Sequence, residues 1–191
     1  MKKFLSVMLV LTMMVTMTAC GSKSAEETTT APTVEAPASA LEILENVWAN
    51  YAEEEKFPVI GGSMANPVDG APGNYDITDE NITYNLLIPA DQIANITEAA
   101  SMIHMMNANT FTCGVFRLAD GVSAADFGTV MKDAVVNNQW MCGFPETLLI
   151  KDIAGEYVLV AFGVNDAMTP FETHFSAAYP DAETLVNEPI A

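Results

Sequence analysis

The sequence predicts an α+β domain built on a four-stranded antiparallel sheet, with its helices packed on one face of the sheet. Two observations predict it. Two pairs of β-rich apolar runs, within residues 99–118 and 147–163, are each joined by a short turn. Each pair is followed by a segment with apolar residues at helical spacing, so the order is ββαββα after a first helix.

The first predicted element of the domain is a helix that follows Ser39. Ser39 and Glu42 have the spacing of a capping box, and apolar residues recur every three or four positions from there to Tyr51. Pro58 sets the limit of this helix. Residues 57–79 are rich in Gly, Pro, Asn and Asp, which predicts one long loop.

Residues 81–88 leave two alternatives open. Apolar side chains alternate from Ile82 to Ile88 as in a strand, whereas the preceding Thr-Asp-Glu at 78–80 resembles a helix start. The periodicity favours the strand.

Two hairpins and two helices complete the domain. The first hairpin pairs 99–106 with 110–118 through an Asn-Ala-Asn turn, and a helix capped by Ser123 follows it. The second hairpin pairs 147–153 with 156–163 around an Ala-Gly turn. The last helix is expected to begin with a capping Thr169, a first-turn Pro170 and a Glu172 three residues after the cap.

The N-terminal segment has the pattern of an export signal. Lys2 and Lys3 precede an uncharged, mostly apolar stretch at 4–15, and small residues lead to Cys20. The end of this segment, Met17-Thr18-Ala19-Cys20, resembles the lipobox of bacterial prolipoproteins. The resemblance implies cleavage before Cys20 and attachment of a lipid such as palmitate to its thiol. The alternative is an uncleaved membrane anchor, which the threonines of the segment disfavour.

These observations divide the chain into three parts. Residues 1–19 are the signal peptide, residues 20–40 are the lipidated cysteine and a disordered linker, and residues 41–191 are a single α+β domain. We expect the lipid to hold the protein on the extracytoplasmic face of the cell membrane. A flexible linker of this length has a root-mean-square reach of about 25 Å, which keeps the domain near the membrane.

The charge of the protein excludes some partners. Without the signal peptide, the chain has five basic and 25 acidic residues, a net charge of −20. Such a charge repels nucleic-acid phosphates and anionic lipid headgroups. We therefore expect no nucleic-acid partner, and contact with the membrane only through the lipid.

The stretch from Leu86 to Gly163 also resembles a known protein family. The residues concerned are the run from Ser101 to Asn107, the helix after Ser123 and the strand Gly155-Glu156-Tyr157-Val158-Leu159-Val160. They are similar to a family of small, membrane-anchored lipoproteins of Gram-positive anaerobes that forms a domain of unknown function. The resemblance implies a helix at 79–87 and supplies no catalytic residues.

Cys113 and Cys142 are the two cysteines that remain after lipidation. An exported protein can join such a pair, and a loop of this size would stabilise the fold by about 3 to 4 kcal/mol. The alternative is two free thiols that act as small apolar groups. They do not form a Cys-x-x-Cys motif, which disfavours thiol–disulfide exchange.

One segment suggests a metal site. Met102, His104 and Met106 would share a face of a strand, and thioether and imidazole ligands suit cuprous copper. The alternative is that the methionines fill the core.

No catalytic motif is recognised, so we expect no catalytic residues, no cofactor and no enzymatic activity. Two functions compete. The first is a non-catalytic binding or interaction module with an unknown protein or small-molecule partner. The second is an extracytoplasmic copper or redox accessory protein that uses His104 or the pair Cys113 and Cys142.

Overall fold

A computed structural model of the chain describes residues 37–190. The predicted signal peptide, the lipid-carrying Cys20 and most of the predicted linker lie outside these residues. No helix of the described part has the length and apolar character needed to cross a membrane.

The domain is built on one eight-stranded antiparallel sheet, in the order β2-β1-β4-β5-β7-β6-β8, and β3 also pairs with β4. Because β5 occupies one edge of β4, the short β1 and β3 share its other edge. The strands are β1 (Val59–Gly61), β2 (Val68–Asp69), β3 (Gly73–Tyr75), β4 (Ile96–His104), β5 (Phe111–Leu118), β6 (Thr147–Ile153), β7 (Tyr157–Gly163) and β8 (Glu183–Pro189).

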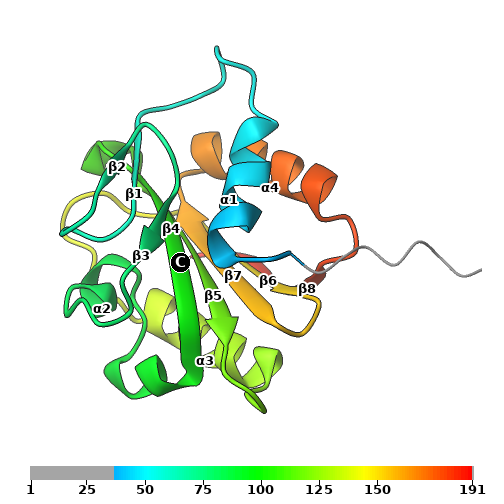
Figure 1. Cartoon of the computed structure of the whole chain (residues 1–191). Helices are drawn as coiled ribbons and strands as arrows, with labels where there is room; N and C mark the ends of the chain where they lie inside the picture. The colour runs from blue at the N-terminus through cyan, green and yellow to red at the C-terminus, as the bar shows by residue number, and fades with distance from the viewer. Residues whose placement is uncertain (1–36, 191) are drawn as a thin grey trace, which may run out of the picture. The chain divides into compact units, whose positions relative to one another are not determined.

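Helices cover both faces of this sheet. Figure 1 shows α1 and α4 beside each other on one side and α3 on the other. The helices are α1 (Ala40–Ala49), α2 (Ile82–Asn85), α3 (Ala124–Val136) and α4 (Asn165–Ala178), with 3-10 turns η1 (Ala90–Asn95) and η2 (Asn107–Asn109). The sheet therefore lies between two apolar cores, one under α1 and α4 and one under α2 and α3.

The predicted fold is wrong in its strand number, element order and layering. The two predicted hairpins are present as β4–β5 and β6–β7, but the predicted loop at 57–79 contains β1, β2 and β3, and β8 follows α4. The sheet has eight strands instead of four, and the order is not ββαββα. Every residue of β7 is buried, because apolar helices pack on both of its faces.

The start of α1 confirms Ser39 as the N-cap, while Glu42 bonds the residue before Ser39 and not Ser39 itself, as a full capping box would. The Ser39 hydroxyl accepts a hydrogen bond of 3.0 Å from the backbone N–H of Glu42. The Glu42 carboxylate in turn accepts one of 2.8 Å from the N–H of Ala38. The helix thus satisfies two exposed backbone donors with local side chains.

The strand favoured for residues 81–88 is wrong, since this segment forms the one-turn helix α2. Ile82 and Leu86, four residues apart, are both buried, whereas Tyr84 between them is 82% exposed. Burial at this spacing is helical, because a strand would place all three side chains on one face.

Helix α4 begins five residues earlier than predicted, at Asn165 with Val164 as its N-cap. Its first N–H groups do not depend on Thr169. The carboxylate of Glu146, in the segment before β6, accepts a hydrogen bond of 2.7 Å from the N–H of Asn165. Pro170 therefore lies inside the helix and not in its first turn.

Candidate functional site

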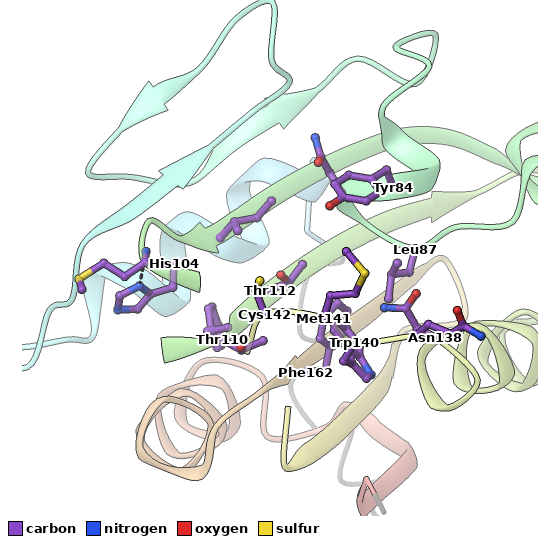
Figure 2. A pocket seen from close by; sticks show the side chains of 15 residues that line it. Tyr84, Leu87, His104, Thr110, Thr112, Asn138, Trp140, Met141, Cys142 and Phe162 are labelled. Atoms are coloured by element: carbon purple, nitrogen blue, oxygen red, sulfur yellow. Dashed lines mark hydrogen bonds between the residues drawn. The ribbon is translucent and has the colours of Figure 1, made fainter. Parts of the chain in front are cut away.

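A pocket of about 500 Å³ opens beside the turn of the β4–β5 hairpin. Helix α2 forms one part of its wall, and the irregular segment between α3 and β6 forms another. In the view of Figure 2, His104 lies at one end of the pocket and Asn138 at the other. The lining residues are Tyr84, Asn85, Leu87, Ile103, His104, Met106, Thr110, Phe111, Thr112, Asn138, Gln139, Trp140, Met141, Cys142 and Phe162.

None of the lining residues is an Asp, Glu, Lys or Arg. This is unusual in this protein, because residues 37–190 include 22 acidic and four basic residues. The pocket is therefore an uncharged site in a strongly acidic domain. A group bound there gains little from ion pairing and is recognised by apolar contact and neutral hydrogen bonds.

The inner wall of the pocket is aromatic. Phe162, on β7, is almost fully buried and belongs to the core under α2 and α3. The Trp140 ring packs against Phe162 with ring centroids 5.4 Å apart. The indole N–H of Trp140 is buried and has no acceptor among residues 37–190.

Three neutral amides, Asn85, Asn138 and Gln139, line the pocket. Asn85 donates a hydrogen bond of 2.8 Å to the Tyr75 hydroxyl, which fixes its orientation beside α2. The side chains of Asn138 and Gln139 make no hydrogen bond within the described residues. Their donors and acceptors are available to a ligand.

The rim of the pocket exposes large apolar side chains. Tyr84, Met106 and Met141 line the pocket and are 82%, 55% and 87% exposed. Two further exposed side chains, Met105 and Phe144, lie within two residues of the lining in the sequence. A gathering of exposed apolar groups around a cavity marks an interaction site.

His104 closes one end of the pocket. Its ring stacks on Phe57, with centroids 5.3 Å apart and an angle of 9° between the planes. Nδ1 accepts a hydrogen bond of 2.9 Å from the backbone N–H of Met106. Burial lowers the pKa of His104, so the ring is neutral at pH 7 and carries its hydrogen on Nε2.

The copper candidates occupy different surroundings. Met102 is fully buried in the core under α1 and α4, while Met106 lies on the exposed rim. Nδ1 of His104 is already an acceptor for a backbone N–H, so only Nε2 remains for a ligand bond. Within residues 37–190, no three His, Cys, Asp or Glu side chains are placed to hold a metal ion. The copper site stays a prediction.

Both cysteines of the domain are free thiols in this structure. Cys113 is buried in the core under α1 and α4, and burial raises its pKa well above the ordinary value. Cys142 is exposed and lines the pocket. Pairing of the two stays a prediction.

Two other polar residues lie away from the pocket. The His174 ring is 4.1 Å from the Tyr51 ring by centroids, and its Nε2 lies 3.6 Å from a Glu55 carboxylate oxygen. Arg117 pairs with Glu156 near the β6–β7 turn. Of the predicted site residues, the structure brings His104, Met106 and Cys142 to the pocket and leaves Met102 and Cys113 in the core under α1 and α4.

Sequence reasoning missed most of the pocket, although one signal was present. Trp140, Met141 and Phe144 are large apolar residues in a connection between two predicted elements, where polar residues are the usual choice. No family model, curated protein or solved structure matches the chain. Function is therefore argued from the geometry of this pocket, and the resemblance to the small-lipoprotein family stays a prediction.

Proposed function

We propose that this chain is a lipoprotein, anchored through Cys20 on the extracytoplasmic face of the cell membrane, and that its domain is a non-catalytic binding module. The observation that carries the binding role is the uncharged pocket of about 500 Å³ with an aromatic inner wall. Ligand sites have volumes of roughly 300 to 1,000 Å³, mostly apolar walls and a few polar groups.

The lining favours recognition over chemistry. Its titratable side chains are Tyr84, His104 and Cys142, and no hydrogen bond between any two of them is found in the described structure. Acid–base or nucleophilic catalysis needs such groups in contact or within reach of a shared substrate atom. Amides and aromatic rings, in contrast, bind without reacting.

Anchoring is tested on the full chain expressed in a Gram-positive host with radiolabelled palmitate. The wild-type protein is expected to carry label and to sediment with membranes, whereas C20A carries none and is released. An unlabelled wild-type protein, or a C20A variant with the same processing and retention, would contradict the anchor.

Binding is tested by NMR with the methionine methyl groups labelled with ¹³C and indole as a neutral aromatic probe. We expect shifts of the Met106 and Met141 methyl signals, because both side chains line the pocket. Met64 is a matched control, since it is 71% exposed and does not line the pocket. Equal shifts at Met64, or none at the two pocket residues, would contradict a binding role for this site.

A further inference from the structure

We infer that the pocket receives an apolar side chain of a peptide segment whose flanking residues are basic. This inference rests on the proposed binding function and names the kind of partner. Three features of the described domain carry it: the apolarity of the inner wall, the amides and methionines of the lining, and the sign of the domain's charge.

The inner wall fits an uncharged apolar anchor. Phe162 of β7 and Ile103 of β4 belong to the core under α2 and α3 and present aromatic and aliphatic carbon to the pocket. Burying an anchor of this kind is the main source of affinity at peptide and protein interfaces. A basic or acidic side chain would lose its hydration there without gaining an ion pair, because none of the lining residues is charged.

The amides of the wall match a peptide backbone. Each peptide unit offers one N–H donor and one C=O acceptor. Asn138 and Gln139 each offer both groups on one side chain, and neither has a side-chain hydrogen bond in residues 37–190. An extended segment that crosses the rim can therefore satisfy its backbone while one side chain enters the pocket.

The rim suits a partner whose shape is not fixed. Met106 and Met141 are flexible and polarizable, and methionine is common on surfaces that accept varied apolar partners. Tyr84 adds an exposed ring that can cover an apolar side chain and still hydrogen-bond through its hydroxyl.

The negative charge of the domain favours a peptide whose anchor is flanked by basic residues. All four basic residues of the described domain are already engaged: Lys56 with Glu53, Lys132 with Glu188, Arg117 with Glu156, and Lys151 with the Thr184 hydroxyl. None of them lines the pocket.

Acidic residues, by contrast, flank the lining segments. Glu80 is exposed four residues before Tyr84, and Glu146 follows Cys142 by four residues. The described domain as a whole, with 22 acidic and four basic residues, also carries a net negative charge, which favours Lys and Arg and repels Asp and Glu in the flanks of a bound peptide.

The experiment measures peptide binding by calorimetry to the full-length lipoprotein in phosphatidylcholine nanodiscs. Three capped peptides share a central Gly-Trp-Gly and differ in their flanks, which are pairs of Lys, Ser or Glu. We expect the Lys peptide to bind at least tenfold more tightly than the Ser peptide at low salt, and the Glu peptide to bind weakest. The Lys advantage should shrink at 0.5 M salt because exposed charges are screened.

Variants place the interaction at the pocket. M141A is expected to weaken binding of the Lys peptide at least fivefold, and M64A is its matched control. E80Q is expected to reduce the advantage of Lys flanks more than E183Q, which removes the same charge from an exposed position on β8.

The outcomes separate the two proposals. Equal affinity for the three peptides, or binding that M141A leaves unchanged, overturns the peptide inference. If indole shifts the pocket methionines but the Lys peptide binds no better than N-acetyl-tryptophanamide, the pocket is a small-molecule site and only the peptide inference fails. If neither indole nor any peptide binds, both proposals fail.

Discussion

The Nδ1 atom of His104 accepts a hydrogen bond of 2.9 Å from the backbone N–H of Met106, two residues further along the chain. The bond holds the chain where it leaves β4 and enters the rim of the pocket. It requires an unprotonated Nδ1, and the low exposure of the ring also opposes a positive charge. Protonation of His104 would therefore break this hydrogen bond and place a poorly hydrated positive charge in the protein.

This arrangement predicts a pH dependence of stability. Because the folded state lowers the pKa of His104 below its ordinary value of 6.5, the unfolded chain binds more protons as the pH falls below that value. The contribution of the neutral ring is complete above about pH 6.5 and is lost as the pH falls towards the lowered pKa. In H104N the amide oxygen can accept the same hydrogen bond and does not titrate. Urea unfolding at pH 7.5 and 5.5 should show a smaller loss for H104N than for the wild type, and equal losses would contradict this role.

The N-cap serines predict a graded loss of stability. S39A removes the acceptor for the Glu42 N–H and is expected to lower the free energy of unfolding by about 1 kcal/mol. S123A, at the start of α3, should cost less, because the hydroxyl of Ser123 accepts a longer bond of 3.3 Å from Asp126. Urea denaturation of the two variants provides the comparison, and a larger loss in S123A would contradict the ranking.

Substitution by alanine is expected to have different effects at Gly163 and at Gly128. A Cβ on Gly163 would lie 2.5 Å from the Thr110 carbonyl oxygen and 2.9 Å from the Phe111 Cα. Because both atoms are backbone, G163A is expected to destabilise the fold by about 1 to 3 kcal/mol.

G128A is the matched comparison. A Cβ on Gly128 would lie closest to Cδ1 of Leu185, at 2.9 Å, and this atom is the end of a flexible side chain. Alanine also favours a helix over glycine by about 1 kcal/mol. Thermal and urea unfolding should show little change for G128A. If G163A is as stable as G128A, the backbones of β5 and β7 can move apart at this position at little cost, and the prediction is wrong.

The thiols predict selective alkylation. Cys113 is fully buried, which raises its pKa and denies access to a reagent, whereas Cys142 is exposed. Iodoacetamide at pH 7.5 should modify Cys142 in the folded protein and Cys113 only after unfolding, as read by peptide mass spectrometry. If neither thiol reacts in urea until a reductant is added, the cysteines are joined and the free state described above does not hold in solution.

The hairpins were predictable because their signals are local. Alternating or continuous apolar runs flank short turns such as Ala154-Gly155, and the structure places a strand on each side. The covering of both faces of the sheet by helices could also have been predicted from the sequence. Residues 157–163 are apolar without interruption, which is typical of a strand covered on both faces. The prediction that helices cover only one face of the sheet did not take this continuous apolar run into account.

The remaining errors come from contacts between residues distant in sequence. The strands β1, β2 and β3 have two or three residues each, too few to show a period; β1 and β3 pair with the edge of β4, and β2 pairs with β1. The N-terminus of α4 is fixed by Glu146, which lies 19 residues before Asn165. The pocket likewise joins α2, the ends of three strands and the α3–β6 segment, so no short stretch of sequence contains it.

The central strand β7 divides its side chains between the two layers. Leu159 and Ala161 belong to the core under α1 and α4, while Val158 and Val160 belong to the core on the opposite side. Loss of either helical layer would expose one face of β7 to water, and the other layer packs on the opposite face of the same strand. The two halves of the sandwich are thus expected to melt together in a single calorimetric transition, and neither should persist as an isolated folding unit.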